Sequence, residues 1–185
     1  MRKGKFIVIS GPSGVGKGTI CSVLLNELDA WYSVSMTTRE KREGETHGKE
    51  YYFVTKEEFE EKINNNELLE YNNYNGNYYG TPKDAVVKKL NEGIDVFTEI
   101  DVNGAKQIKS IFPESLLIYI APPSIEELRK RLTDRATETD KVIEERIKIA
   151  EEELKQANIY DFIVVNENLE RAIEEVRNII TKEDR

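Results

Sequence analysis

The sequence predicts an α/β fold in which a parallel β-sheet is flanked by helices. Two observations support this prediction. Short continuous apolar runs alternate with helical stretches along the 185 residues, and a glycine-rich segment separates the first run from the first helix. Continuous apolar runs are typical of strands covered on both faces, and strands that alternate with helices form parallel sheets with right-handed crossovers. We therefore expect a single domain built around one central sheet.

Four apolar runs are predicted to be the strands of this sheet. Because apolar residues dominate each run, we expect these strands to be buried. A helix is predicted after the first strand and its glycines, since Ile20, Leu24 and Leu28 recur at helical spacing. The predicted strands are residues 6–9, 96–100, 116–120 and 162–165.

Two further helices have sequence signals at their ends. Ser124 followed by Glu127 is a capping box, and it begins a helix that we expect to continue to Arg135. Thr81 followed by Pro82 is a cap with proline at the first helical position, and this helix is expected to end near Gly93. Each helix lies next to a predicted strand in the sequence, as the α/β alternation requires.

Two polar segments interrupt this alternation. Residues 35–80 contain polar alternation and many tyrosines, and seven of the fourteen positions from 64 to 77 are Asn. Asparagine favours turns and loops over regular core elements, so we expect an insertion here, with a merely solvated insertion as the alternative to a functional one. Residues 133–140 are also polar and lie between two predicted helices. The prediction is therefore one domain with two polar insertions.

Charge and cysteine content argue against several classes of protein. The chain has 27 Lys and Arg against 35 Asp and Glu, a net charge of −8, which argues against sequence-independent binding to nucleic acid or anionic membranes. Cys21 has no second cysteine for an internal disulfide, and with His47 it supplies too few ligands for a zinc site. No apolar run has the length of a signal peptide or a membrane-spanning helix. We expect a soluble chain in a reducing compartment, most simply the cytoplasm.

The glycine-rich segment after the first strand matches the G-x-x-x-x-G-K phosphate loop. Glycines let backbone N–H groups turn inward around a phosphate, the following helix adds the positive end of its dipole, and Lys17 reaches the β- and γ-phosphates. The Ser or Thr that usually follows the lysine as a magnesium ligand is replaced by Gly18. Either Thr19 approaches the Mg²⁺ ion, or water and nucleotide oxygens hold it. The predicted loop is Gly11, Pro12, Ser13, Gly14, Val15, Gly16, Lys17, Gly18 and Thr19.

The polar segment 35–80 has residues suited to bind another phosphate. Arg39 and Arg42 lie three positions apart, and with Tyr51 they are able to clamp a phosphate monoester through charge-assisted hydrogen bonds. The alternative is an ordinary solvated charged surface. Asp101 follows a predicted strand, and ligands of parallel sheets bind at the carboxyl ends of strands.

With these motifs the chain resembles the guanylate kinases, from Phe6 to about Ile180. The resemblance implies a P-loop NTPase-type parallel sheet flanked by helices, with a small mixed α/β GMP-binding insertion and a short helical lid. It also implies transfer of the γ-phosphoryl group of ATP to GMP, giving ADP and GDP, by direct in-line transfer with Mg²⁺. The stretches that carry the resemblance are the glycine loop, residues 37–53, Asn77-Tyr78-Tyr79-Gly80, Ile100-Asp101, Ala121-Pro122-Pro123-Ser124 and Arg135-Ala136-Thr137-Glu138-Thr139.

The resemblance assigns a role to each part of the single domain 1–185. Its core is expected at residues 1–34, 82–130 and 150–185, its GMP-binding region at 35–81, and its lid at about 131–149. The lid and the acceptor region are expected to close over the nucleotides, because water must be excluded from the γ-phosphate until the acceptor is present. The implied partners are the nucleotides ATP and GMP, with no obligate protein partner.

Individual site residues are implied by the same resemblance. Thr81 stands where serine is common in the family, Lys41 where many members have proline, and Glu99 where aspartate is frequent. Helix salt bridging, for example between Arg131 and Glu127, is the structural alternative for the lid arginines. The implied catalytic residues are Lys17, Arg39, Arg135 and Arg146. The implied ATP-binding residues are the loop from Gly11 to Thr19 with Arg131, Arg135 and Asn166, the last near the adenine. The implied GMP-binding residues are Ser35, Arg39, Arg42, Glu45, Tyr51, Glu70, Tyr79, Thr81 and Asp101.

The chemistry of guanine agrees with this set of residues. Guanine presents the acceptor O6 and the donors N1–H and N2–H₂, so the carboxylates of Glu70 and Asp101 can accept from the donors. The hydroxyls of Ser35 and Thr81 can donate to O6. Adenine has an unprotonated N1, which would leave a carboxylate without its hydrogen bonds, and such a mismatch discriminates by roughly 10⁴-fold. No catalytic base is expected, since the attacking phosphate oxygen is already anionic.

Three other functions compete with this interpretation. A GTPase is suggested by the D-x-x-G pattern at residues 101–104, but residues 166–169 lack the Lys and Asp of the N-K-x-D guanine reader. A catalytically inactive guanylate-kinase-like interaction module would usually have lost the phosphate loop or the acceptor residues, which are present here. A kinase for another nucleoside monophosphate is the closest chemical alternative, and it is distinguished by the guanine-reading residues.

Overall fold

The computed structural model describes residues 2–74, 76–134 and 139–182 of the chain. The chain divides into two compact units. The first unit, here called the acceptor unit, consists of Met1–Ile7, Asp29–Thr98 and Asn103–Ser115. The second unit, here called the loop unit, consists of Val8–Leu28, Glu99–Val102 and Leu116–Arg185.

The predicted parallel sheet is present, and all four predicted strands belong to it. The strand order is β2-β7-β1-β8-β9, with β2 parallel to β7 and β9 parallel to β8. Every residue of β1 and β8 is buried, as expected for strands covered on both faces. The strands are β1 (Phe6–Ser10), β2 (Trp31–Tyr32), β7 (Val96–Glu99), β8 (Leu116–Ala121) and β9 (Phe162–Val165).

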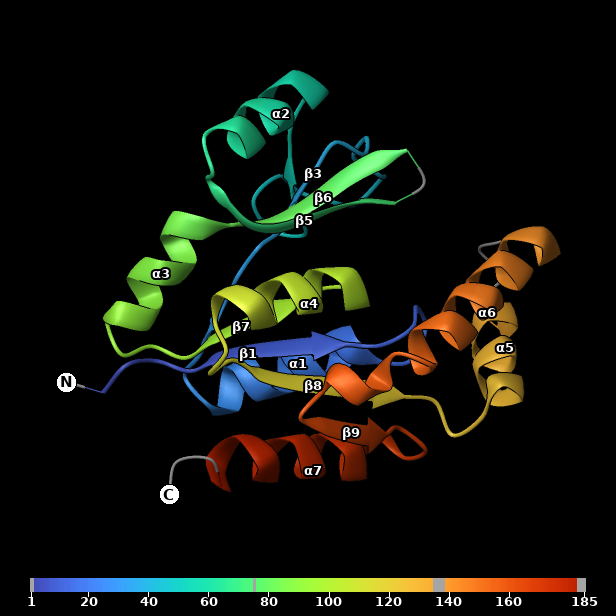
Figure 1. The fold of residues 1–185 in the computed structure, drawn as a ribbon. Helices are drawn as coiled ribbons and strands as arrows, with labels where there is room; N and C mark the ends of the chain where they lie inside the picture. Colours follow the sequence, from blue (N-terminus) through green and yellow to red (C-terminus); the bar gives the residue numbers. More distant parts are fainter. Residues whose placement is uncertain (1, 75, 135–138, 183–185) are drawn as a thin grey trace. The chain divides into compact units, whose positions relative to one another are not determined.

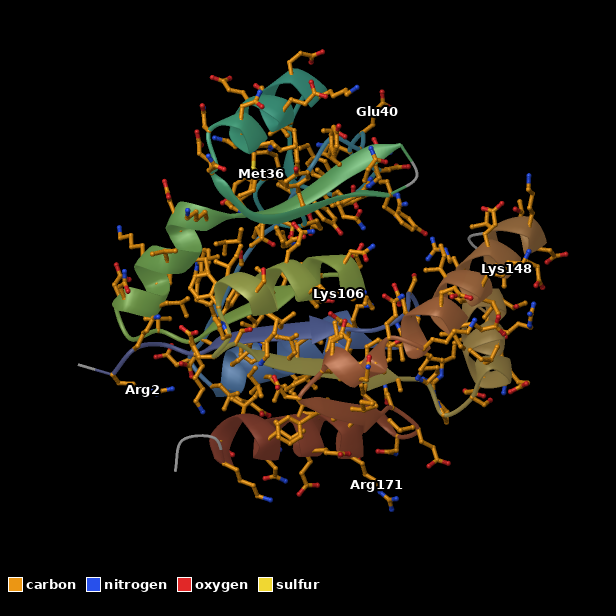
Figure 2. All side chains as sticks on the ribbon, viewed as in Figure 1. Arg2, Met36, Glu40, Lys106, Lys148 and Arg171 are labelled. Atoms are coloured by element: carbon orange, nitrogen blue, oxygen red, sulfur yellow. The ribbon has the colours of Figure 1, made fainter. Side chains whose placement is uncertain are left out.

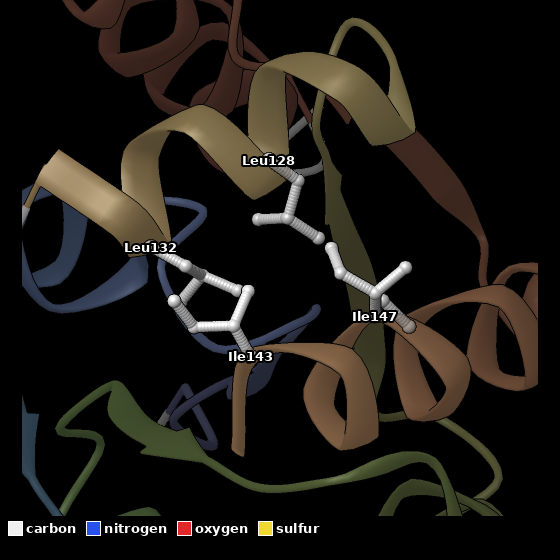
Figure 3. Packing of buried hydrophobic residues seen from close by; sticks show 5 residues of the cluster. Leu128, Leu132, Ile143 and Ile147 are labelled. Carbon is white, nitrogen blue, oxygen red and sulfur yellow. The ribbon is translucent and has the colours of Figure 1, made fainter. Parts of the chain in front are cut away.

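Helices of the loop unit pack on one another and on the strands. Figure 1 shows α7 lying along β9, and α5 running beside α6. Apolar side chains of α5 and α6 interlock, with Leu128 and Leu132 facing Ile143 and Ile147 (Figure 3). None of the helices in the described ranges is both long enough and apolar enough to cross a membrane. The elements are α1 (Lys17–Glu27), α5 (Ile125–Asp134), α6 (Asp140–Leu154), the 3₁₀ turn η1 (Ala157–Ile159) and α7 (Leu169–Lys182).

The acceptor unit contains a second sheet with the order β4-β3-β6-β5. Strands β5 and β6 form the long hairpin drawn in green in Figure 1. Phe59 of α2 is fully buried and stacks on Tyr78 of β6, with ring centroids 5.1 Å apart, and Met36, labelled in Figure 2, is also buried. Helix α2 begins with a complete capping box of Thr55 and Glu58. The elements are β3 (Met36–Thr37), β4 (Tyr52–Phe53), α2 (Lys56–Asn64), β5 (Leu68–Tyr74), β6 (Asn77–Pro82), α3 (Lys83–Asn91) and α4 (Val102–Ile111).

The expectation that the asparagine-rich stretch avoids regular structure was wrong. Strand β5 runs through it and pairs with β6 over most of its length. Leu69 is 2% exposed and anchors the strand, while Asn72 is half-buried and Asn73 is exposed. Pairing with a neighbouring strand therefore overrides the preference of asparagine for turns.

Two details of the predicted elements also differ. The helix expected to start with Pro82 at its first position begins one residue later, because Pro82 is extended (φ −59°, ψ 130°) and ends β6 together with Thr81. Strand β9 was expected to be buried, but Phe162, Ile163 and Val165 are exposed, since β9 is the last strand of its sheet. The predicted cap at Ser124 is confirmed, because its Oγ accepts from the backbone N–H of Glu127 at 3.1 Å.

Candidate functional site

The phosphate loop has the predicted context of strand, glycine loop and helix. Strand β1 ends at Ser10 and helix α1 begins at Lys17, with Gly16 as its N-cap in a left-handed conformation (φ +100°). The Lys17 ammonium group donates to the backbone oxygens of Gly11 (2.5 Å) and Pro12 (3.1 Å). Lysine and helix N-terminus therefore place positive charge at the same loop, as binding of an anionic phosphate requires.

Asn166, which follows β9, supports this loop through a hydrogen bond to its backbone. Its side-chain nitrogen donates to the backbone oxygen of Val15 at 2.8 Å, and the residue is only 5% exposed. A Cβ atom at Gly16 would lie 2.6 Å from that nitrogen, and the φ of +100° is strained for any other residue, so a substitution there would displace the Asn166 amide and strain the backbone. Arg131 in turn donates to the backbone oxygen of Asn166 (3.0 Å) and to Glu127 (3.1 Å). These contacts hold the backbone of the phosphate loop in place. The predicted contact of Asn166 with adenine stays a prediction.

One of the arginines predicted to lie in the lid contacts the loop directly. Arg146 of α6 donates a hydrogen bond from its guanidinium group to the side-chain oxygen of Ser13. Two predicted site residues, 133 positions apart, therefore meet in the loop unit. The third predicted lid arginine, Arg135, lies outside the described residues.

Glu153, near the end of α6, places a carboxyl group close to the loop lysine. Its Oε2 atom is buried and has no hydrogen-bond partner among the described residues. Burial raises the pKa of the Glu153 carboxyl above its ordinary value, while Lys17 lowers it in part and Asp101 raises it. The charge of Glu153 also raises the pKa of Tyr119 and Tyr160, after the larger effect of their burial, and the two rings lie 5.0 Å apart. Glu153, Lys17 and Asp101 are thus electrostatically coupled.

Replacing Glu153 by Gln is expected to stabilise the protein at neutral pH by about 1 kcal/mol, or about 2–4 °C in Tm. The reason is that a buried carboxylate oxygen without a partner is costly to ionise. Because the folded-state pKa is raised above the unfolded value of 4.5, the native carboxyl loses stability as the pH rises through the folded pKa. The advantage of the variant should therefore vanish below about pH 4.5 and should grow as the pH rises through the folded-state pKa of Glu153.

Thermal unfolding of both proteins between pH 4 and 8 measures this effect. Glu145→Gln changes an exposed glutamate of the same helix and is the matched control, with no pH-dependent gain expected. A difference between Glu153→Gln and the native chain that is the same at every pH would contradict the assignment of the titrating group.

In the acceptor unit, Arg39 is held in one position by a carboxylate and two aromatic rings. Its guanidinium group donates to Glu45 Oε1 at 2.8 Å and lies 5.5 Å from the ring centroid of Tyr51 and 5.7 Å from that of Phe53. The hydrogen bond from Arg39 holds the pKa of Glu45 below its usual range, so the carboxylate stays ionised. Tyr79 packs edge-on against Tyr51, with centroids 5.9 Å apart. The structure therefore brings together four residues that the sequence assigned to the acceptor phosphate and its surroundings.

A second pair of predicted residues meets inside the hairpin of β5 and β6. Glu70 is opposite Thr81 in the strand register, and the Thr81 hydroxyl donates to Glu70 Oε1 at 2.6 Å. Glu70 is 4% exposed and Thr81 is fully buried. Gly80 makes this close approach possible, because a Cβ atom there would lie 2.9 Å from the backbone oxygen of Glu70 and from the Phe59 ring. The result is a buried carboxylate held by a hydroxyl group, which is suited to accept hydrogen bonds from a ligand.

The remaining predicted acceptor residues differ in burial and in the unit to which they belong. Arg42 is exposed, and its backbone N–H donates to Glu45 Oε2 at 2.8 Å. Ser35 is half-buried, and its backbone oxygen accepts from the backbone N–H of Tyr52 at 2.9 Å. Asp101 is half-buried after β7 and belongs to the loop unit. The direct roles of the Arg42, Ser35 and Asp101 side chains remain predictions.

Sequence reasoning missed two residues of these clusters. Phe53 lies two positions after Tyr51, and the period-two spacing that places both rings beside Arg39 was a usable signal. Glu153 lies three positions after Ala150 on the helix face whose Ile143 and Ile147 are buried. A glutamate on an apolar helix face is a signal of a buried charge.

Comparison with known proteins identifies the family. The guanylate kinase family model matches residues 3–183. A guanylate kinase of Clostridium tetani (strain Massachusetts / E88) is 50% identical over 183 residues, 99% of this chain and 88% of that protein. One of Bacillus subtilis (strain 168) is 49% identical over 98% of this chain and 90% of that protein. The crystal structure of guanylate kinase from Anaplasma phagocytophilum has a TM-score of 0.83 at 34% identity, covering 98% of this chain and 87% of that one. With sequence, family model and fold in agreement over almost its whole length, the chain belongs to the guanylate kinase family.

Proposed function

We propose that the protein transfers the γ-phosphoryl group of ATP to GMP, giving ADP and GDP. The observation that carries the proposal is the buried Glu70 carboxylate, fixed by the Thr81 hydroxyl at 2.6 Å inside the acceptor unit. A carboxylate accepts from N1–H and N2–H₂ of guanine but faces the unprotonated N1 of adenine, so it favours GMP over AMP. Membership of the guanylate kinase family supports the same substrate.

The cluster around Arg39 would bind the phosphate of GMP. Arg39 already has its side chain ordered by Glu45 and by the rings of Tyr51 and Phe53. Because the guanidinium group is held before the ligand arrives, less side-chain entropy is lost on binding. Arg42 and Tyr79 would add a second cation and a hydroxyl group, which completes a clamp for a phosphate monoester.

The phosphate loop would bind ATP and stabilise charge during transfer. An oxygen of the GMP phosphate attacks the γ-phosphorus of ATP, and the bond to the β–γ bridging oxygen breaks, so ADP leaves with that oxygen. Lys17 would move from the loop carbonyls to the β- and γ-phosphates, where Arg146 and Arg135 would add positive charge. The attacking oxygen is already anionic near neutral pH, and no residue has to remove a proton from it.

The oxygen atoms beside the loop fit a magnesium ion that accompanies ATP. Glu99 Oε1 would lie 3.9 Å from a Cβ atom at Gly18, and Thr19 is the next residue. Mg²⁺ prefers oxygen ligands and keeps several of its waters, so Thr19 and Glu99 would hold the ion directly or through water. When bound, the ion would neutralise charge on the transferred group.

We infer that the protein acts in the cytoplasm on nucleotides rather than on nucleic acid or at a membrane. The net charge of −8 supports this inference, because binding to nucleic acid or to an anionic membrane needs a basic protein surface. The single cysteine supports a reducing compartment.

An assay of ADP release with GMP, AMP, dTMP and UMP offered separately tests the proposed function. Turnover with GMP is expected to exceed that with AMP by at least about 100-fold in kcat/KM. Comparable turnover with AMP would contradict the guanine assignment. The absence of turnover with all four would instead favour a catalytically inactive interaction module.

A further inference from the structure

The side chain of Gln107 in helix α4 forms two hydrogen bonds with the backbone of strand β5. The Tyr71 backbone N–H donates to Gln107 Oε1 at 3.2 Å, and Gln107 Nε2 donates to the Tyr71 backbone oxygen at 2.9 Å. Both residues belong to the acceptor unit. A single primary amide therefore pairs with both backbone groups of one residue, as a neighbouring strand would.

The position of Tyr71 in the sheet explains why this pairing is available. Strand β5 is the outermost strand of the order β4-β3-β6-β5, and Tyr71 is opposite Gly80 on β6. Because both backbone groups of Tyr71 bond to Gln107, they point away from β6, toward the open edge. A Cβ atom built at Gly80 would lie 3.2 Å from Tyr71 Cβ. Such a close approach is typical of two opposite residues that form no backbone hydrogen bonds with each other. Gln107 thus continues the sheet by one peptide-like group.

The residue next to this pairing is Glu70. Successive side chains of a strand point to opposite faces, and Tyr71 is 42% exposed while Glu70 is 4% exposed. Because Glu70 and Tyr71 are adjacent on one strand, a shift of the β5 backbone at Tyr71 would move the Glu70 carboxylate relative to Thr81. A hydrogen bond of 2.6 Å between two buried groups is sensitive to such a shift.

We propose that Gln107 is a positioning residue for guanine recognition, which holds the β5 backbone so that Glu70 meets the base in the correct place. This inference rests on the proposed function, because it assigns Glu70 to the guanine. Gln107 is not expected to touch either nucleotide. Its contribution should therefore appear in the affinity for GMP and not in the chemical step or the affinity for ATP.

Two substitutions separate the hydrogen bonds of Gln107 from its bulk. Gln107→Glu keeps the size but places an oxygen against the Tyr71 carbonyl, and Gln107→Met keeps the length without either hydrogen bond. Each is expected to raise KM for GMP about tenfold, with kcat changed less than about threefold and KM for ATP less than about twofold. Ser110→Ala, which removes only a bond to the Gln107 backbone oxygen within the same helix, is the control and should change none of these constants.

Coupling with Glu70 distinguishes positioning from general support of the fold. In a Glu70→Gln background, Gln107→Met is expected to change KM for GMP less than about twofold, because the group that it positions is gone. A further tenfold loss in that background, or equal losses for GMP and ATP, would overturn the proposal. An unchanged KM for GMP in both single variants would overturn it as well.

Hydrogen exchange at the Tyr71 amide tests the pairing without any nucleotide. Exchange in Gln107→Met should be at least about tenfold faster than in the native chain, with the amides of β1 unaffected. Unchanged exchange would overturn the proposal even if KM rises. If the native protein fails to phosphorylate GMP while exchange accelerates as expected, the proposed function fails and the pairing of Gln107 with β5 stands.

Discussion

Lys17→Ala is expected to lower kcat by about 10²–10³-fold with Tm changed by only a few degrees. Lys17 is the one positively charged side chain of the loop from Gly11 to Thr19, and it is proposed to bind the β- and γ-phosphates. In the structure its ammonium group is bound to the carbonyls of Gly11 and Pro12. The variant loses these two hydrogen bonds and the favourable effect of the Lys17 charge on the Glu153 carboxyl, which lowers its stability. It also loses the positive charge at the transferring group, which lowers the rate.

Steady-state kinetics with GMP, together with thermal unfolding, measures both losses. Lys41→Ala changes an exposed lysine of the acceptor unit and should leave kcat and Tm within about twofold and one degree of the native values. If Lys17→Ala keeps more than a tenth of the native kcat, the loop does not act on the transferred phosphate as proposed.

Glu70→Gln is expected to lower kcat/KM for GMP by about 100-fold while KM for ATP changes little. The glutamine amide has only one oxygen. If this oxygen accepts from Thr81, the NH₂ group faces the N1–H and N2–H₂ donors of guanine, and if the oxygen faces guanine, Thr81 loses its acceptor. IMP lacks the N2 amino group, so its kcat/KM should fall less than that of GMP. The ratio of the two substrates should therefore contract in the variant.

Glu67→Gln is the matched control for this substitution. Glu67 is three positions away, is half-buried and pairs with Lys62 at 2.6 Å, outside the contact of Glu70 with Thr81, so its loss should leave the GMP to IMP ratio unchanged. Equal losses with GMP and IMP in Glu70→Gln would show that Glu70 supports the fold or the phosphate clamp and does not read the guanine.

The central sheet and the phosphate loop were predictable because their signals are local. An unbroken apolar run such as 116–120 indicates a buried strand wherever it occurs, and β8 is buried along its whole length. The loop around Lys17 combines strand, glycine spacing and helix within a few residues of one another. Such patterns require no knowledge of which strand neighbours which.

The features that the sequence did not predict depend on pairing across the chain. The exposure of Ile163 follows from the place of β9 at the end of the strand order, which no local pattern encodes. The contact of Glu70 with Thr81 depends on the register of a hairpin inside the asparagine-rich stretch. The family resemblance named both residues as guanine readers, but only the structure shows that one fixes the other.

The pairing of Gln107 with β5 illustrates the same limit. Gln107 is an ordinary polar residue on a helix, 36 positions from Tyr71, and nothing in the sequence connects the two. The residues proposed to bind a nucleotide belong to recognisable motifs, whereas Gln107, proposed to position one of them, is found only through its hydrogen bonds.

A crystal structure with adenosine and guanosine joined through five phosphates tests most directly whether this chain brings ATP and GMP together head to head. We expect the phosphates nearest the adenosine to lie on the loop around Lys17, those nearest the guanosine on Arg39, and the guanine edge on Glu70. A guanine bound away from Glu70, with its phosphates unable to continue to the loop, would contradict the account.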